Sequence, residues 1–200
     1  MVHALLLHLQ STSMSTDSVH LAPGTLLVAA PVMDDPNFRQ TVILLCDHGA
    51  EGSFGLVLNQ PTDVHLGDVM DSYFVDDPPL FLGGPVQRET LHFVHRYPEA
   101  IPESISVLPN VRWGGTYDAV EARVQNEGAP PDQIRFFLGY TGWSPRQLQH
   151  EVEQDAWILT KARANWIFDT EPQALWRTVM RAMGGEYALL STYPEDPRMN

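Results

Sequence analysis

Residues 25–59 have the sequence TLLVAAPVMDDPNFRQTVILLCDHGAEGSFGLVLN, in which three short apolar runs alternate with turn-forming residues. The runs TLLVAA (25–30), TVILLC (41–46) and FGLVLN (54–59) are rich in Val, Ile and Leu, and their length favours buried strands over helices. The first link, PVMDDPNFRQ, predicts a turn followed by about one helical turn. The second link, DHGAEGS, contains two glycines, so we expect the second and third strands to be antiparallel neighbours.

The rest of the chain adds further strands and then helices. Strands are predicted at 80–83, 91–95, 105–108, 134–140, 157–160 and 166–168, and helices at 66–74, 117–127, 144–156 and 172–183. The third helix has the clearest start, with Ser144 as N-cap, Pro145 in the first helical position and Gln147 completing a capping box. Because strands predominate first and helices follow without strict alternation, we predict an α+β fold with a mixed sheet.

Length and composition favour one domain. The chain has 200 residues, 44% of them hydrophobic, which is enough to bury a core. We expect a disordered or mis-assigned tail at 1–20, with Met14 as an alternative start to Met1, a domain at 21–192 and a flexible tail at 193–200. The apolar run at 4–7 is too short for a signal peptide or a membrane span. With a single cysteine and no export signal, a cytoplasmic location is expected.

The charge balance bears on partners. Lys and Arg total 12 and Asp and Glu total 25, giving a formal net charge of −13. Duplex binding depends on clustered cations that neutralise phosphates, so direct nucleic-acid binding is not expected. The expected partner is an unknown protein or a small ligand, and binding to a membrane is not expected.

Cofactor and metal motifs are not found in the sequence. It contains no GxGxxG, GxxxxGK[ST], CxxC, HxH or HExxH pattern, so we predict no cofactor and no metal site. His92 and His95 lie three apart on a predicted strand and would point to opposite faces.

Two segments carry reactive side chains. The segment at 139–144 lies where a hydrolase nucleophile elbow would, although it lacks the GxSxG pattern. A hydrolase or transferase reading would use Thr141 or Ser144 as nucleophile, with Asp34, Asp35 or His48 brought in by the fold. Cys46, which Asp47 and His48 follow, is either a redox thiol with His48 modulating its pKa or a buried small hydrophobe.

Three ordered blocks resemble the bacterial YqgE/AlgH family. The first is residues 21–61, with its A-x-P strand end, D-P-x-F turn, Cys-acid-His strand end and N-x-P. The second is LGGPV (82–86), and the third is RFFLGYTGWSPRQLQHEVEQDAW (135–157). Asp47 stands where Glu is common in the family, and Arg146 replaces a frequent Gly.

The resemblance implies a fold but little chemistry. It implies an α+β protein whose bifurcated mixed sheet curls into a pseudo-barrel with flanking helices. Family members have been described as candidate transcriptional regulators or as uncharacterised, and no catalytic residues carry over. Our leading interpretation is a non-enzymatic regulatory or interaction protein. The motif residues to examine for a shared pocket are Asp35, Phe38, Asn59, Gly83, Gly84, Gly142 and Trp143.

Overall fold

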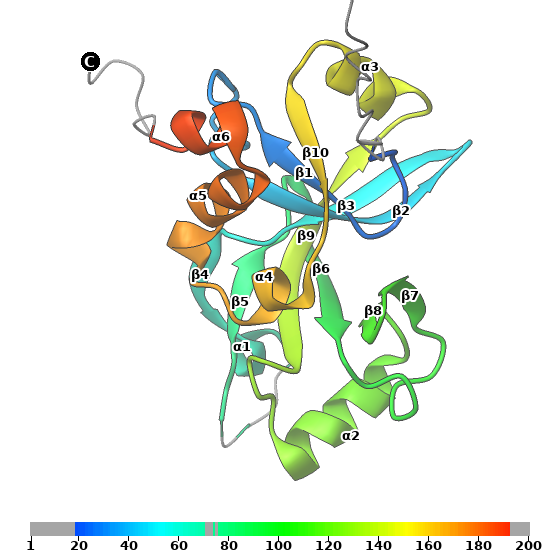
Figure 1. The fold of residues 1–200 in the computed structure, drawn as a ribbon. Coiled ribbons are helices and arrows are strands. Elements are labelled where there is room, and N and C mark those ends of the chain that lie inside the picture. The colour runs from blue at the N-terminus through cyan, green and yellow to red at the C-terminus, as the bar shows by residue number, and fades with distance from the viewer. Residues whose placement is uncertain (1–18, 71–73, 75, 193–200) are drawn as a thin grey trace, which may run out of the picture.

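The computed structural model describes residues 19–70, 74 and 76–192 (Figure 1). Its strands are β1 (Thr25–Ala29), β2 (Val42–Gly49), β3 (Gly52–Val57), β4 (Pro61–His65), β5 (Pro79–Leu82), β6 (Val86–His95), β7 (Ile105–Leu108), β8 (Val111–Trp113), β9 (Ile134–Trp143) and β10 (Trp157–Lys161). Its helices are α1 (Leu66–Met70), α2 (Tyr117–Glu127), α3 (Gln147–Glu153), α4 (Ala164–Phe168), α5 (Pro172–Met183) and α6 (Gly185–Leu190).

One mixed sheet organises the molecule, and β9 is the strand at which it divides. The main path runs β10-β1-β2-β3-β9-β6-β8-β7, and β5, which carries β4, also pairs with β9. The first half of β9 lies between β5, which is parallel to it, and β6, which is antiparallel; its last three residues pair with β3. The expected α+β class with a mixed, bifurcated sheet is therefore confirmed. The sheet curls but is not closed, because β10 and β7 end the path and do not pair with each other among the described residues.

Glycines allow the chain to cross β9 between β5 and β6, which flank it. A Cβ on Gly83 would lie 2.3 Å from the carbonyl oxygen of Gly139, and a Cβ on Gly84 would lie 2.3 Å from the carbonyl carbon and oxygen of Tyr140. Gly84 also has a φ of 155°, a conformation that side chains disfavour. The sequence LGGPV is thus explained by backbone crossing, since two main chains approach here without side chains between them.

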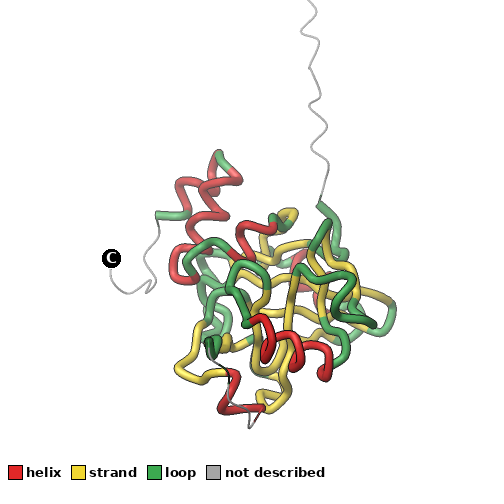
Figure 2. Tube along the Cα trace, turned by 90° about the horizontal axis from the view of Figure 1, so that it is seen from below, coloured by secondary structure: helices red, strands yellow, loops and turns green. Residues whose placement is uncertain are grey.

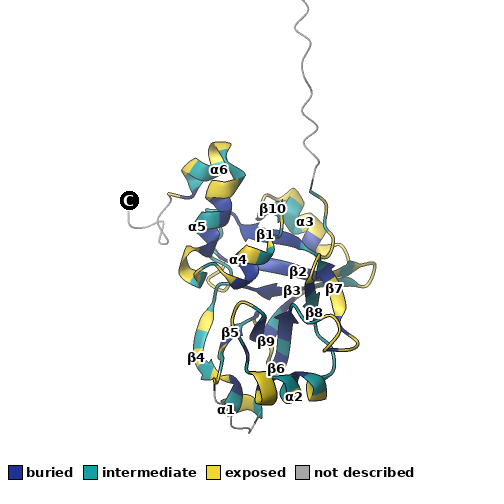
Figure 3. Ribbon diagram, turned by 60° about the horizontal axis from the view of Figure 1, so that its bottom comes forward, coloured by how far each residue is buried: buried dark blue, intermediate teal, exposed yellow. Residues whose placement is uncertain are grey.

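The core consists of three clusters on the faces of this sheet. The largest fills the inner face of β1, β2 and β3 and receives α4 and α5. A second lies between β6, β9 and α2, and a third between the outer face of β1–β3 and α3. In Figure 3 the central strands are dark blue, as buried elements, while exposed residues lie on the helices and turns. Strands buried on both faces explain the continuous apolar runs of the sequence.

Helices lie around the strands and not among them, as the tube view makes plain (Figure 2). The helix that matters most for the site is α5, which begins with Pro172 at its first turn and ends at Gly184, whose φ is 73°. Its buried face, Leu175, Trp176, Val179 and Met180, follows helical spacing. The indole Nε1 of Trp176 donates to the carbonyl of Ala29 over 2.8 Å, which fixes α5 against β1.

Three sequence predictions are wrong. Residues 166–168 belong to helix α4 and not to a strand. Helix α3 begins at Gln147 after a left-handed Arg146, so Ser144 is not its N-cap; the Gln147 side chain accepts from the Ser144 N–H and hydroxyl instead. Strand β9 continues to Trp143, three residues beyond the predicted end, because its residues 141–143 pair with β3.

Other elements were missed or shortened. Strands β4 and β8 and helix α6 were not predicted, since they are short and carry little apolar periodicity. Helix α1 ends at Met70, and residues 71–73 of the predicted helix lie outside the described residues. Residues 1–18 of the predicted tail at 1–20, and the whole predicted tail at 193–200, also lie outside them. None of the described helices has both the length and the apolar composition required to cross a bilayer.

Candidate functional site

A polar cavity of about 440 Å³ lies where three segments distant in sequence meet. The connection before β2 and the residues after β3 form two of its walls, and the first turns of α5 form the third. We call this space the polar cavity. Its lining is Arg39, Gln40, Thr41, Asn59, Gln60, Gln173 and Trp176. Convergent polar side chains over a buried aromatic ring are typical of small-molecule sites.

Asn59 joins two of the three segments. Its Oδ1 accepts from the Val42 N–H over 2.9 Å, and its Nδ2 donates to the Gln40 carbonyl over 2.9 Å. The neighbouring Gln60 donates from Nε2 to the carbonyl of Asn37 over 3.0 Å. Both amides therefore fix the connection before β2 at the end of β3, and they set the width of the cavity between the two segments.

Asp35 and Phe38 shape the loop that presents Arg39. The Asp35 carboxylate accepts from the Asn37 N–H over 2.8 Å, and its carbonyl accepts from the N–H groups of Phe38 and Arg39. This forms the single helix-like turn expected from the sequence. Phe38 then packs edge-on against Trp157, with ring centroids 5.6 Å apart. The loop is thus held by a capped turn at one end and an aromatic contact at the other.

Among the described residues that line the cavity, Arg39 alone carries a formal charge. Its Nε is buried and has no hydrogen-bond partner, and no carboxylate forms an ion pair with it in the described part of the chain. An uncompensated guanidinium in a partly enclosed space attracts anions, and its planar donors suit a carboxylate or a phosphate. Gln60 and Gln173 add amide groups that can donate or accept beside such an anion.

The other motif residues lie elsewhere. Gly83 and Gly84 form the crossing over β9, and Gly142 and Trp143 lie beside the β2–β3 hairpin. The Nε1 groups of Trp143 and Trp157 both donate to Oε2 of Glu151, over 2.9 and 2.8 Å, and so fix α3 to the sheet. Of the seven motif residues, only Asp35, Phe38 and Asn59 act around the polar cavity.

Cys46 occupies the inner core. It is fully buried, and its thiol lies 3.6 Å from the carbonyl of Leu44. Burial raises the pKa of the Cys46 thiol strongly, and the negative charge of Asp47 raises it further. His48 directs its Nδ1 to the hydroxyl of Ser53, 2.7 Å away across the hairpin. These contacts favour the buried-hydrophobe alternative for Cys46, because a reactive cysteine needs an accessible thiolate.

The residues of the hydrolase reading are not assembled. Thr141 is buried inside β9, with its hydroxyl 3.4 Å from the carbonyl of Gly83, and Ser144 bonds Gln147. Among the described residues no hydrogen bond joins either hydroxyl to His48, Asp34 or Asp35. In the same part of the chain, no three His, Cys, Asp or Glu side chains are grouped as metal ligands would be.

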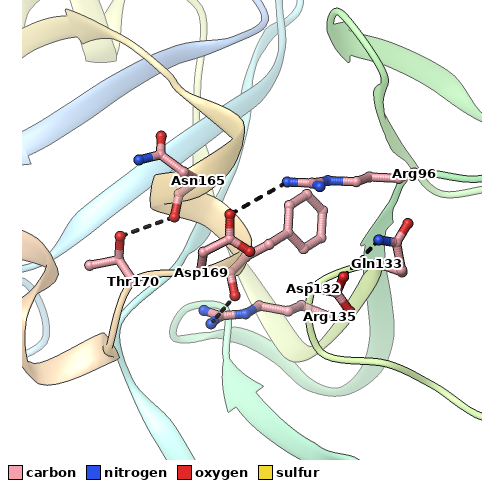
Figure 4. A network of polar contacts seen from close by, with 8 residues as sticks. Arg96, Asp132, Gln133, Arg135, Asn165, Asp169 and Thr170 are labelled. Atoms are coloured by element: carbon pink, nitrogen blue, oxygen red, sulfur yellow. Dashed lines mark hydrogen bonds and ion pairs between the residues drawn. The ribbon is translucent and has the colours of Figure 1, made fainter.

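Two arginines meet under α4 (Figure 4). Arg96 lies 3.8 Å from the Asp169 carboxylate and stacks on Phe168, while Arg135 donates to the Phe168 carbonyl over 3.1 Å. Arg135 is only 8% exposed, and burial lowers its pKa. Since both guanidinium groups act on the end of α4, this cluster holds the segment that leads into α5 and the polar cavity.

Comparison with known proteins places the chain in a family. The AlgH-like family profile matches residues 26–188, and the chain belongs to this family. It is 37% identical over 181 residues to a UPF0301 protein of Cytophaga hutchinsonii, covering 90% of this chain and 100% of that protein. It is 39% identical to a UPF0301 protein of Chlorobium chlorochromatii, over 90% and 96%.

Two solved structures are similar to it. Protein DIP2367 of Corynebacterium diphtheriae gives a TM-score of 0.75 at 25% identity, over 88% of this chain and 94% of that one. The AlgH protein of Pseudomonas aeruginosa gives a TM-score of 0.68 at 27% identity, over 86% and 94%. The names of these relatives assign no activity.

Sequence reasoning missed the residues that give the polar cavity its chemistry. Arg39 and Gln60 stand one residue beyond Phe38 and Asn59, which the motif comparison selected. Their adjacency to turn residues was the available signal, because loops carry binding groups more often than strands do. Gln173 and Trp176 gave no such signal, since only the tertiary packing of α5 brings them to this place.

Proposed function

We propose that this protein is a non-enzymatic regulatory protein that binds a small anionic ligand in the polar cavity. The observation that carries the proposal is Arg39, which lines the cavity together with amide side chains and pairs with no carboxylate of the described residues. The ligand is a carboxylate or a phosphate with additional hydrogen-bonding groups. The protein acts in the cytoplasm, and binding of the ligand changes how the protein binds a partner protein.

The construction of the site supports binding over catalysis. The cavity combines one cation, four amide side chains and one hydroxyl with the ring of Trp176, and among the described residues it offers no nucleophile paired with a base. The side chains of Asn59 and Thr41 already form hydrogen bonds with backbone groups, so the cavity is shaped before a ligand binds. A preformed site loses little conformational entropy on binding.

The other functions considered have less support. A transcriptional role by direct DNA contact is disfavoured by the net charge of −13; a salt-dependent, sub-micromolar DNA complex would overturn this exclusion. The redox function of Cys46 requires an accessible thiolate, and the hydrolase function requires Thr141 or Ser144 next to a base. Neither requirement matches the contacts of these residues.

Nuclear magnetic resonance titration tests the proposal. Uniformly ¹⁵N-labelled protein is titrated separately with inorganic phosphate, citrate and the neutral amide acetamide. We expect saturable shifts of the Arg39, Gln60 and Gln173 backbone amides with at least one of the anions and none with acetamide. Arg39→Gln is expected to weaken that binding by about tenfold or more, because a charge-assisted bond is lost.

Arg181→Gln is the matched control. Arg181 lies exposed on the same helix as Gln173 and Trp176, so its substitution removes an equal charge outside the cavity. We expect it to change the affinity by less than about twofold. If neither anion gives saturable shifts, or if both substitutions weaken anion binding equally, the cavity is not an anion site.

A further inference from the structure

The last three residues of β9 pair with another strand on one side only, and of the three Gly142 is exposed while Thr141 and Trp143 are buried. Thr141–Trp143 pair with β3 on one side, in the register Gly55↔Thr141, Phe54↔Gly142 and Ser53↔Trp143. On the other side β6 reaches only Tyr140, through its first residue Val86. No described strand continues along the edge beyond that point. Unpaired backbone groups at such an edge are a template for another strand.

A groove of about 580 Å³ lies at this edge, beside the β2–β3 hairpin that projects from the sheet in Figure 1. We call it the hairpin groove. Its walls include Asp47, Glu51, Phe54, Val86, Tyr140 and Gly142. Gly142 leaves the groove open, because it has no side chain and the Tyr140 ring lies 3.1 Å from where its Cβ would be.

Aromatic side chains form the floor on one face of the sheet. The rings of Phe54 and Tyr140 stack with centroids 4.7 Å apart, and Trp113 lies on the other side of Phe54 at 4.5 Å. All three rings remain partly exposed. Half-exposed stacked rings provide a surface for the aliphatic part of a long side chain, because that contact buries apolar area while the polar end stays hydrated.

The charge on the groove is negative. Asp47 lies directly across from Phe54 in the strand register, so its carboxylate is on the same face as the rings. Glu51 lies at the hairpin tip. No Lys or Arg lines the groove, and no cation pairs with either carboxylate among the described residues. Two exposed carboxylates beside apolar rings complement a cationic side chain with a long apolar stem.

We propose that the hairpin groove binds an extended, basic segment of a partner protein, which adds as a strand to the free edge of β9. The backbone of the segment pairs with the exposed main chain at Gly142. Its Arg or Lys stems lie against Tyr140 and the edge of the Phe54 ring, and their charged ends reach Asp47 and Glu51. This surface is distinct from the polar cavity, so it provides the protein contact that a ligand-binding regulator requires.

A pair of peptides tests the proposal on the full-length protein. The probes are acetylated, amidated octapeptides that alternate Arg with Thr or Glu with Thr, because Thr favours strands. Each is titrated into ¹⁵N-labelled protein at low and at physiological salt. We expect the Arg peptide to bind and to shift the amide resonances of residues 140–143 and 47–54, and the Glu peptide to leave them unchanged.

Two substituted proteins sharpen the test. The double variant Asp47→Asn/Glu51→Gln is expected to weaken binding of the Arg peptide about tenfold. Gly142→Val fills the groove and is expected to abolish binding; its circular dichroism and melting temperature are measured alongside, because the new Cβ would lie 3.1 Å from the Tyr140 ring. The control double variant Asp63→Asn/Glu99→Gln removes the same charge from exposed positions elsewhere and is expected to bind as wild type.

Four results would each overturn the proposal. They are no binding of the Arg peptide up to about 5 mM, equal binding of the Glu peptide, equal weakening by the two double variants, and peptide-induced shifts confined to other strands. Analytical ultracentrifugation without peptide tests whether a second copy of the chain occupies the groove instead. Dimerisation that Gly142→Val removes would assign the edge to a second copy of the chain.

Discussion

At the scale of single residues, Cys46 shows how burial decides reactivity. Its side chain is fully enclosed and its thiol pKa is raised, so the folded protein holds almost no thiolate. We expect iodoacetamide to alkylate Cys46 at least about a hundredfold more slowly in native protein than in urea at pH 8, as mass spectrometry measures. Alkylation at equal rates in both conditions would restore the redox function.

Substitution of the same residue separates packing from polarity. Cys46→Ala removes a small apolar group and is expected to lower the free energy of unfolding by about 1 kcal/mol. Cys46→Ser keeps the size but buries a hydroxyl, and we expect a larger loss, about 1–3 kcal/mol. Urea denaturation of both variants measures the difference, and a Ser variant as stable as wild type would contradict the apolar surroundings.

His95 makes the fold sensitive to acid. Its Nδ1 accepts from the Tyr97 N–H over 3.1 Å, so its Nε2 is the protonated atom and donates to the Gly114 carbonyl over 3.0 Å. Burial lowers the pKa of His95, and Arg112 lowers it further. The unfolded chain therefore binds the proton first, and the stabilising contribution is present above about pH 6.5 and is lost as the pH falls through the folded pKa.

We expect this linkage in urea denaturation between pH 8 and pH 5. Wild-type protein loses stability below about pH 6.5, and His95→Gln shows a smaller loss over the same range, although it is less stable at pH 8. Some slope remains, because burial also lowers the pKa of His92. His65→Gln, at an exposed position, serves as the control and keeps the wild-type slope. Parallel slopes for wild type and His95→Gln would show that another group is responsible.

At the scale of elements, the crossing over β9 depends on Gly84. A Cβ there would meet the Tyr140 carbonyl at 2.3 Å, and the backbone conformation is one that alanine disfavours. Gly84→Ala is therefore expected to lower the free energy of unfolding by about 3 kcal/mol or more. Gly49→Ala is the comparison, since nothing lies within 4 Å of its Cβ position; its effect should stay within about 1 kcal/mol. Chemical denaturation of both variants decides whether the crossing is tight.

The elements also show where local sequence is informative. The apolar runs that became β1 and β2 are buried along their length, so composition alone identifies them. The run at 166–168 has three apolar residues, which fit a strand or a buried helix equally. In the structure they belong to helix α4 and lie in the same core cluster as α5. By sequence the segment at 139–144 offers Thr141 as a nucleophile, whereas the structure buries Thr141 in β9. The nearby Gly139 lies at the crossing, and Gly142 lines the hairpin groove. The N-x-P motif identifies Asn59 as a candidate site residue. Gln173 cannot be found in this way, because it reaches the cavity only through the packing of segments more than a hundred residues apart in sequence.

At the scale of the whole molecule, β9 connects the two parts of the sheet. Its adjacent residues Phe136 and Phe137 are both fully buried but face opposite ways. Phe136 packs into the cluster with α2, and Phe137 into the cluster that receives α4 and α5. Because one strand contributes to both clusters and pairs with β3, β5 and β6, neither cluster is expected to persist when the other unfolds.

Matched substitutions at these two positions test this coupling. Phe136→Leu and Phe137→Leu each remove part of a buried ring and are expected to cost roughly 1–2 kcal/mol. Native-state hydrogen exchange is then measured separately for the slowest amides of β1–β2 and of β6. If the sheet is one cooperative unit, each substitution lowers protection in both regions by the same free energy, since both exchange only through global unfolding. If Phe136→Leu lowers protection in β6 alone, the molecule contains two units that unfold separately. In that case β9 connects them without coupling their stability, and the hairpin groove, which β2, β3, β6 and β9 all line, lies between the two units.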